Sequence, residues 1–157
     1  MASSSITAAM ENKQKAKASD EKSCIFCKIV NGELPCSKIY EDKDAFAFLD
    51  IHPINKGHTL IIPKQHFMNI FDVPEPVLKT LVAATKKVAE AVFKGMNCDG
   101  VNVGMNNNSA AGQVVYHIHF HVIPRFKDDG LKLWPQSKYA SDEEKQAAAE
   151  RIRAHIR

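Results

Sequence analysis

The 157-residue chain is 45% hydrophobic and 25% charged, the composition of a globular protein with one domain-sized core. Its net charge of +3 is mild and its lysines are interleaved with acidic residues, so no basic stripe predicts binding to a nucleic-acid backbone. No apolar stretch approaches membrane-spanning length, and the first residues lack the apolar run of a secretory signal. We therefore expect a cytoplasmic protein, with a nuclear location as the alternative, that has neither a nucleic-acid nor a membrane partner.

The chain begins with residues 1–22, which have too few apolar side chains to offset the entropy of ordering. We predict a disordered N-terminal tail there. A folded domain at residues 23–135 should follow, and then a helical extension at 136–157, in which Ser141 and Glu144 have the spacing of a capping box.

Within the domain, the first element is a short helix near residues 24–32, which Asn31 and Gly32 should end. Its apolar side is predicted to hold Ile25, Phe26 and Ile29. Strand-like runs bounded by turn residues lie at 37–41, 45–51, 58–63, 99–106 and 113–124. Between the third and fourth of these runs, residues 74–96 repeat apolar side chains with a helical period over more than five turns. The pattern predicts an α+β fold: a roughly five-stranded antiparallel sheet with one long helix and short terminal helices.

The last strand-like run contains "YHIHFHVIPR", which places His117, His119 and His121 at alternate positions. On a strand these side chains would share one face, and the apolar residues between them would face the long helix. Three interpretations are open: a metal site, a nucleophile with its helpers, or a solvated face. Strict alternation of three histidines favours a functional site over a solvated face.

The chain has four cysteines, Cys24, Cys27, Cys36 and Cys98, which we expect to be reduced because no export signal is present. The Cys24-x-x-Cys27 pair is compatible with a redox pair, two core thiols or half of a zinc site. The redox interpretation is disfavoured, because the pair lacks the preceding strand of a thioredoxin-like motif.

These motifs resemble those of the histidine triad superfamily of nucleotide hydrolases and transferases. The segment "HIHFHVI" fits its His-φ-His-φ-His-φ-φ signature, where φ is apolar. The segments "CIFCKIVNGELPCSKIYED", "AFAFLDIHPINKGHTLIIPKQH" and "NVGMNNNSAAGQVVYHIHFHVIPR" resemble successive blocks of its Hint-type branch, particularly the microbial proteins with Cys-x-x-Cys. The similarity covers roughly residues 24–126, so residues 23–135 are identified as a histidine triad domain.

The resemblance implies a nucleophilic mechanism at the α-phosphate of nucleoside monophosphate conjugates, either AMP phosphoramidates or acyl adenylates. His119 would attack phosphorus and form a nucleotidyl-histidine, which water then hydrolyses to release AMP. His121 would donate a proton to the phosphate oxygens or to the departing atom.

The resemblance also implies the nucleotide-binding residues. Asp50 would accept the ribose hydroxyls and Ile51 would border the base, in a pocket that takes AMP or GMP. Asn106 would lie beside the phosphate, with Asn107 and Asn108 as alternatives. The residues of the phosphate-binding loop would be Gly112, Gln113 and Val114, whose backbone N–H groups stabilise developing negative charge together with the Gln113 side chain.

Each of these residues has a simpler interpretation. Asp50 and the asparagines could be ordinary turn residues, and Gln113 a solvated loop residue. Val114 departs from the pattern, because relatives often have a hydroxyl there that helps the leaving group. Its side chain cannot donate a proton, so the sequence does not fix the preferred leaving group.

One structural zinc per chain is a further implication of the resemblance. Its ligands would be Cys24, Cys27, His66 of the "PKQH" segment, and His117. The first triad histidine would then be structural and the other two chemical, with His58 behind the triad. The alternative is that Cys24 and Cys27 are metal-free core thiols, since cysteines are often buried.

The family forms homodimers through the long helices with a continuous sheet, and the broad apolar surface of residues 77–96 agrees with such an interface. Trp134 lies in "LKLWPQ", which resembles a segment that reaches the partner's active site. The helix after it departs from that pattern, so the alternative is that Trp134 only anchors the tail. Three functions compete: a Hint-like hydrolase of AMP conjugates, an Fhit-like dinucleoside polyphosphate hydrolase, and a nucleotide-binding interaction protein with incidental turnover. The segment "GQVVYHIH" and the chain length favour the first, with a purine nucleotide as partner.

Overall fold

The computed structural model describes residues 21–132 and 134–156. They form two compact units that divide after Lys127. Nearly all of the predicted N-terminal tail lies outside the described residues, and the predicted boundary between residues 135 and 136 stays a prediction. No helix in the described parts of the chain is both long enough and apolar enough to cross a membrane.

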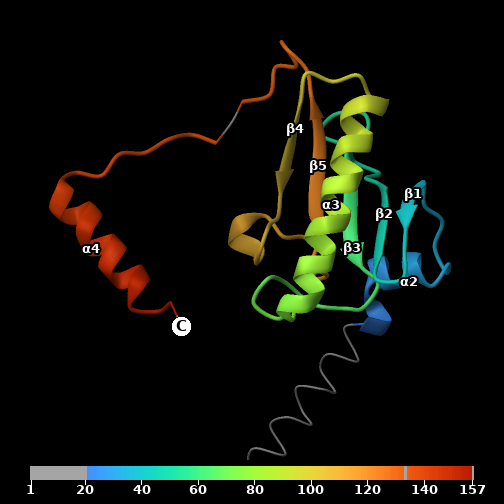
Figure 1. Ribbon diagram of the computed structural model, residues 1–157, viewed down its shortest axis with the longest axis horizontal. Coiled ribbons are helices and arrows are strands. Elements are labelled where there is room, and N and C mark those ends of the chain that lie inside the picture. Colours follow the sequence, from blue (N-terminus) through green and yellow to red (C-terminus); the bar gives the residue numbers. More distant parts are fainter. Residues whose placement is uncertain (1–20, 133, 157) are drawn as a thin grey trace, which may run out of the picture. The chain divides into compact units, whose positions relative to one another are not determined.

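The first unit is a five-stranded antiparallel sheet with a long helix against one face (Figure 1). Its strands are β1 (Lys38–Glu41), β2 (Ala45–Leu49), β3 (Thr59–Pro63), β4 (Gly100–Gly104) and β5 (Phe120–Arg125). The order in the sheet is β1-β2-β3-β5-β4, so the first three strands form the predicted meander and β5 lies between β3 and β4. The predicted fold class is confirmed.

The long helix α3 (Glu75–Gly95) follows the predicted span closely. One of its faces is buried on the sheet through Leu81, Ala84, Val88 and Val92. The facing residues of the sheet are Ala45, Ala47, Ile61 and Val122. The small alanines of β2 allow the helix to approach closely, and each buried Leu or Val contributes roughly 1.5–3 kcal/mol of hydrophobic stabilisation.

The short helix α2 (Ile25–Val30) packs on the opposite face of the sheet. Because β2 alternates its side chains, its alanines contact α3 while Phe46 and Phe48 join the apolar cluster around α2. Phe26 is buried in this cluster, as predicted, but Ile25 is half exposed. A helix of six residues is too short for its apolar side to be defined by periodicity alone.

The strand predicted at residues 113–124 begins only at Phe120. Before that residue the chain runs beside the segment that follows β3, where the Ile118 N–H donates to the carbonyl of Phe67 at 2.6 Å. Only His121 of the three alternating histidines therefore lies in a regular strand. Of the apolar residues among them, Val122 belongs to the core cluster with α3, and Phe120 packs against that cluster, as predicted.

The second unit contains α4 (Asp142–Arg153), which has no buried residues. Its N-cap is Ser141, whose hydroxyl oxygen accepts the Glu144 N–H at 3.2 Å, as the capping box predicts. Trp134 is 88% exposed, and both of its predicted roles stay predictions.

Candidate active site and metal cluster

The three alternating histidines fall into two groups of contacts. His117 is fully buried beside α2 and the segment after β3, while His121 contacts the loop between β2 and β3. His119 lies between them and is also buried. We call the first group the Cys–His cluster and the second the relay group, which consists of Asp50, His58 and His121.

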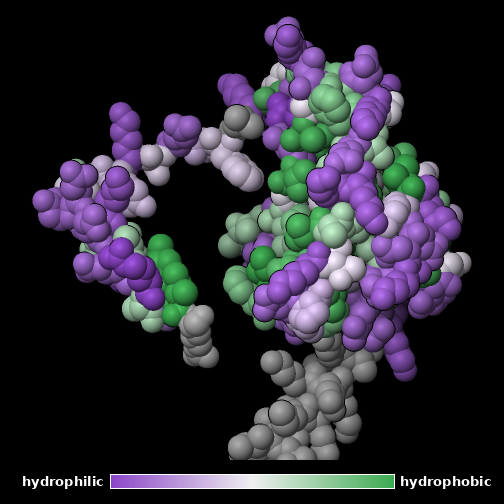
Figure 2. Space-filling model, in the orientation of Figure 1, coloured by the Kyte–Doolittle hydropathy of each residue, from purple (hydrophilic) through white to green (hydrophobic). Residues whose placement is uncertain are grey.

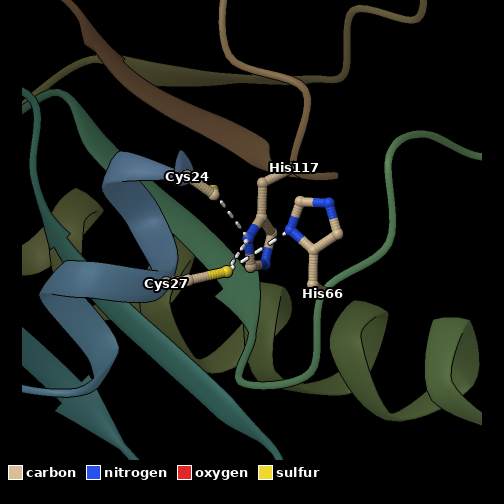
Figure 3. A group of neighbouring side chains, drawn as sticks. All are labelled: Cys24, Cys27, His66 and His117. Carbon is tan, nitrogen blue, oxygen red and sulfur yellow. Dashed lines mark hydrogen bonds between the residues drawn. The ribbon is translucent and has the colours of Figure 1, made fainter. Parts of the chain in front are cut away.

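The Cys–His cluster consists of Cys24, Cys27, His66 and His117, whose ligand atoms all lie within 4.8 Å of one another. Cys24 precedes α2, Cys27 is in its first turn, His66 follows β3 and His117 precedes β5 (Figure 3). The fold thus brings together all four predicted zinc ligands, although Cys27 and His117 are 90 residues apart in sequence.

The distances in the cluster fit a tetrahedral metal site. The Cys27 sulfur lies 3.3 Å from Nδ1 of His66 and 3.5 Å from Nδ1 of His117, and the Cys24 sulfur lies 3.5 Å from the same nitrogen of His117. Metal bonds of roughly 2.3 Å to sulfur and 2.0–2.1 Å to nitrogen give a tetrahedron with edges of about 3.5 Å. These four residues can therefore hold a metal in a closed site.

The protonation of the cluster agrees with that role. Nε2 of His117 is 2.9 Å from the carbonyl oxygen of Pro63, which can only accept, so Nε2 bears a hydrogen and Nδ1 is the nitrogen that faces the two sulfur atoms. Burial disfavours ionisation of Cys24, but hydrogen bonds with His117 and His66 lower its pKa to about 5. Burial and the adjacent Cys24 raise the pKa of Cys27 to about 12. Metal binding would thus release the Cys27 proton.

The imidazole of His119 has a fixed tautomer. Its Nδ1 lies 2.6 Å from the carbonyl oxygen of His117, so Nδ1 carries the hydrogen and Nε2 keeps its lone pair. Burial lowers the pKa of His119, which keeps the ring neutral near pH 7. The edge of the ring meets Phe26 at a centroid distance of 5.3 Å and an angle of 87°. A neutral imidazole with an available Nε2 is a competent nucleophile.

The relay group is a chain of hydrogen bonds that ends at a buried nitrogen. The Ile54 N–H donates to Nδ1 of His58 at 3.3 Å, so Nε2 of His58 bears the hydrogen and donates to Nδ1 of His121 at 2.9 Å. Nε2 of His121 then carries the remaining hydrogen and has no hydrogen-bond partner among residues 21–132 and 134–156. His58 lies behind the triad, as predicted.

Burial lowers the pKa of both relay histidines. For His121 it acts together with the nearby His119 and His58 and lowers the pKa to about 4. For His58 burial outweighs the opposing effect of Asp50, whose Oδ2 lies 3.4 Å from Nδ1 of His58. His121 is therefore neutral near pH 7 and presents an N–H donor.

Asp50 also has a local structural contact. Its Oδ1 accepts the His52 N–H at 2.8 Å, which is the turn interaction that the simpler interpretation of Asp50 predicts. The carboxylate has further lone pairs and is only partly buried. The neighbouring Ile51 is 84% exposed, so its side chain is available to a ligand.

The predicted phosphate-binding loop has a rigid backbone. Gly112 has a φ of 86°, a conformation that side chains with a Cβ rarely adopt. The Gln113 side chain is buried: its Oε1 accepts the Asn108 N–H, and its Nε2 donates to the carbonyls of Met68 and Val115. Both amide hydrogens of Gln113 are thus engaged by backbone oxygens. The backbone N–H groups of Gly112 and Gln113 also donate within the loop, to the carbonyls of Ser109 and Asn108.

The three asparagines of the loop differ in their contacts. The Asn107 side chain accepts from the Ile70 N–H, and that of Asn108 accepts from Asn69. Asn106 donates to the Gly112 carbonyl within the loop at 3.4 Å, a long bond that a ligand could replace. Val114 is 86% exposed. These contacts favour Asn106 over its two neighbours as the residue beside a phosphate.

Sequence reasoning missed the contact of Phe26 with the histidines. Its ring meets those of both His117 and His119. The only signal in the sequence was its position between the two cysteines of Cys-x-x-Cys.

Comparison with known proteins gives a consistent result. The HIT domain family matches residues 31–128. An uncharacterised HIT-like protein of Methanocaldococcus jannaschii is 50% identical over 107 residues, which are 68% of this chain and 82% of that protein. Adenosine 5'-monophosphoramidase HNT1 of Saccharomyces cerevisiae is 43% identical over 78% of this chain and 77% of its own length. Adenylylsulfatase HINT3 of Arabidopsis thaliana is 42% identical over 69% of this chain, but only 55% of that protein is covered.

Solved structures show the same fold. A Streptococcus mutans protein superposes with a TM-score of 0.81 at 41% identity, over 85% of each chain. A zinc-bound histidine triad family protein from Mycobacterium smegmatis superposes with a TM-score of 0.68 at 35% identity, over 87% of this chain and 99% of that one.

Proposed function

This chain belongs to the HIT domain family, and from that membership we propose that it hydrolyses nucleoside monophosphate conjugates at the α-phosphate. The substrates would be AMP phosphoramidates or acyl adenylates, and the product AMP. The observation that supports this most directly is the pair of neutral histidines, His119 with a free Nε2 and His121 with an unpartnered Nε2–H. The names of two relatives, adenosine 5'-monophosphoramidase and adenylylsulfatase, agree with an adenylyl substrate.

In the first step, Nε2 of His119 attacks phosphorus and the bond from phosphorus to the leaving group breaks. His121 donates a hydrogen bond from its Nε2–H to the departing atom; a carboxylate then leaves as the anion, and an amine leaves with a proton taken up from solvent. The Nδ1–H of His119 keeps its bond to the His117 carbonyl, which stabilises the positive charge that develops on the ring. In the second step water attacks the nucleotidyl-histidine, the bond from phosphorus to Nε2 of His119 breaks, and the proton that water loses passes to solvent. His119 is neutral again, and AMP is released.

Substrate binding would use both sides of the triad. Asp50 would accept the ribose hydroxyls and Ile51 would border the base. On the other side, Asn106 and the backbone N–H of Val114 would bind phosphate oxygens. Gly112, whose N–H donates to the Ser109 carbonyl at 2.9 Å, and Gln113 would hold the loop in shape. Because the Val114 side chain offers no hydrogen-bond donor, donation of a hydrogen bond to the leaving group falls to His121.

The proposal includes one structural zinc per chain in the Cys–His cluster. Its two sulfur and two nitrogen donors are the set that zinc favours in structural sites, and a related histidine triad protein has been solved with zinc bound. When bound, zinc would supply folding free energy and fix the position of His117. The chemistry at phosphorus would still be performed by His119 and His121.

We also propose a homodimer. Val82 and Phe93 are half exposed on α3, and Val103 is half exposed on β4, an edge strand of the sheet. Figure 2 shows apolar surface over the outward side of α3, which a second copy would cover. Light scattering at micromolar concentration should give about twice the chain mass of 17.5 kDa. A monomer would contradict the interface.

The proposed activity is tested by comparing turnover of an AMP phosphoramidate, an aminoacyl adenylate and a diadenosine polyphosphate. The first two should be the better substrates, and quenching in alkaline denaturant during turnover should trap a nucleotidyl group on His119, because the phosphorus–nitrogen bond survives in base; mass spectrometry of peptides locates it. Preference for the polyphosphate would favour the Fhit-like alternative. Binding of AMP without turnover of any substrate would favour an interaction protein.

A further inference from the structure

Phe26 contacts both the metal cluster and the proposed nucleophile. It lies between Cys24 and Cys27 in sequence, and its ring is buried. The ring centroid lies 6.0 Å from that of His117 and 5.3 Å from that of His119. One side chain of α2 therefore packs on a predicted metal ligand and on the residue proposed to attack phosphorus.

The His119 ring has a second contact besides Phe26. The Nδ1–H of His119 donates to the carbonyl oxygen of His117, whose side chain belongs to the Cys–His cluster. His119 is thus held at its Nδ1 by one cluster residue and at its ring edge by Phe26. Both supports come from residues whose positions would be fixed by metal binding to the cluster.

The helix that carries Phe26 has little stability of its own. It has six residues, and its N-cap Cys24 makes no side-chain capping bond. Helices of this length are not stable in isolation, so α2 relies on packing and on whatever binds its two thiols. His121 has a different support, since its Nδ1 bonds to His58, outside the cluster.

We propose that Phe26 is a positioning residue that makes the orientation of His119 depend on metal occupancy of the Cys–His cluster. The inference rests on the proposed function, because it assigns His119 the attack on phosphorus. A nucleophile must be aligned with the bond that breaks, and a misplacement of about 1 Å can cost roughly a hundredfold in rate. The sequence predicts separate structural and chemical roles for the three histidines, whereas these contacts join the two.

The test compares Phe26→Leu with the matched control Phe46→Leu. Both phenylalanines are 5% exposed and belong to the same apolar cluster, but Phe46 makes no ring contact with a histidine within the described residues. Each variant is purified with zinc, and metal content, kcat, KM and the ¹H–¹⁵N imidazole spectrum of ¹⁵N-histidine protein are measured. We expect one metal per chain in both.

In Phe26→Leu the His119 resonances should shift or broaden, and kcat should fall roughly tenfold to a hundredfold with KM near the wild-type value. Phe46→Leu should keep the wild-type spectrum and kcat. Chelation of the metal from the wild-type protein should produce the same change in the His119 resonances, and readdition of zinc should reverse it. In Phe26→Leu chelation should produce a smaller change than in the wild type, because only the bond to the His117 carbonyl still transmits it.

Unchanged His119 resonances in Phe26→Leu, or in the wild type after chelation, would overturn the proposal. If Phe26→Leu does not fold, Phe26→Met and the chelation experiment on the wild type decide the same question. The spectrum also separates the two proposals. If the resonances respond as expected but the wild type turns over no AMP conjugate, the dependence on metal is supported and the proposed function is overturned.

Discussion

The Cys–His cluster and the relay group lie at opposite ends of one histidine triad, and they differ in their donor atoms. Both satisfy the distance condition for a metal site. Each also has one buried nitrogen, on His66 and on His121, without a hydrogen-bond partner in the part of the chain that the structure describes. The cluster offers two sulfur atoms that approach two imidazoles, a soft donor set. The relay group offers a carboxylate and two imidazoles that already share a hydrogen.

This difference shows that neither proximity nor an unpartnered atom identifies a metal site by itself. In the cluster the hydrogen on His117 points away, toward Pro63, and leaves Nδ1 facing the sulfurs. In the relay group the Ile54 N–H donates to His58, and His58 donates to His121. The remaining hydrogen, on Nε2 of His121, has no partner within the described residues. The first arrangement suits metal binding, and the second suits donation of a hydrogen bond.

The largest effect on activity is expected for His119→Ala. The substitution removes the proposed attacking atom, so turnover of an AMP phosphoramidate should fall by roughly 10⁴-fold or more. Metal content should not change, because His119 is not part of the Cys–His cluster. Stopped assays at high enzyme concentration and metal analysis measure both quantities. Retention of near-normal turnover would exclude the covalent mechanism.

The corresponding test of the Cys–His cluster is Cys24→Ser. Cys98→Ser is the control, since both thiols are buried. Cys24→Ser removes a metal ligand, so metal content should fall well below one per chain. Structural zinc supplies on the order of 10 kcal/mol in small domains, and losing about 3 kcal/mol of it would lower Tm by roughly 10 °C.

Cys98→Ser should retain the metal and should lower Tm by much less, because Cys98 is outside the Cys–His cluster and its thiol makes a long hydrogen bond, 3.8 Å, to the Phe93 carbonyl. Metal analysis and thermal denaturation by circular dichroism give both values. Equal Tm and metal content in the two variants would mean that Cys24 and Cys27 are ordinary core thiols.

A smaller effect is expected for Asp50→Ala. Loss of the carboxylate would leave the ribose hydroxyls without acceptors and weaken AMP binding by about 1–3 kcal/mol. The Cys–His cluster should be unaffected, so metal content serves as the internal control. Calorimetry with AMP measures the change, and an affinity equal to that of the wild type would remove Asp50 from the binding site.

The sequence predicted the parts of this molecule that depend on local pattern. The period of α3, the meander and the capping box at Ser141 all follow from spacing within a few residues. The four cluster residues are in contact as the resemblance implies, although zinc binding itself stays a prediction. The roles of the other site residues, the dimer and the cellular location also stay predictions.

The features that were not predicted depend on contacts between distant segments. The start of β5 is set by the bond between Ile118 and Phe67, which an alternating pattern does not reveal. The engagement of both Gln113 amide hydrogens depends partly on Met68, 45 residues away. The contact of Phe26 with His119 joins residues that no local rule relates. The spacing of apolar residues identifies a helix or strand, but it does not identify the distant segment that ends the element or packs against it.

The last test concerns a pH dependence of stability that comes from the relay group. Burial lowers the pKa of His121 from 6.5 to about 4, so between those values the unfolded chain binds a proton at this residue and the folded chain does not. The free energy of unfolding should therefore fall as pH decreases through 6.5 and stop falling from this cause below about pH 4. His121→Gln removes the titrating group, so its stability should decline less than that of the wild type over the same window. Urea unfolding at several pH values, with the metal content of both proteins matched, measures the difference in slope. Parallel curves for the two proteins would show that His121 is not held in its neutral form, and would remove it as the hydrogen-bond donor that distinguishes the relay group from the cluster.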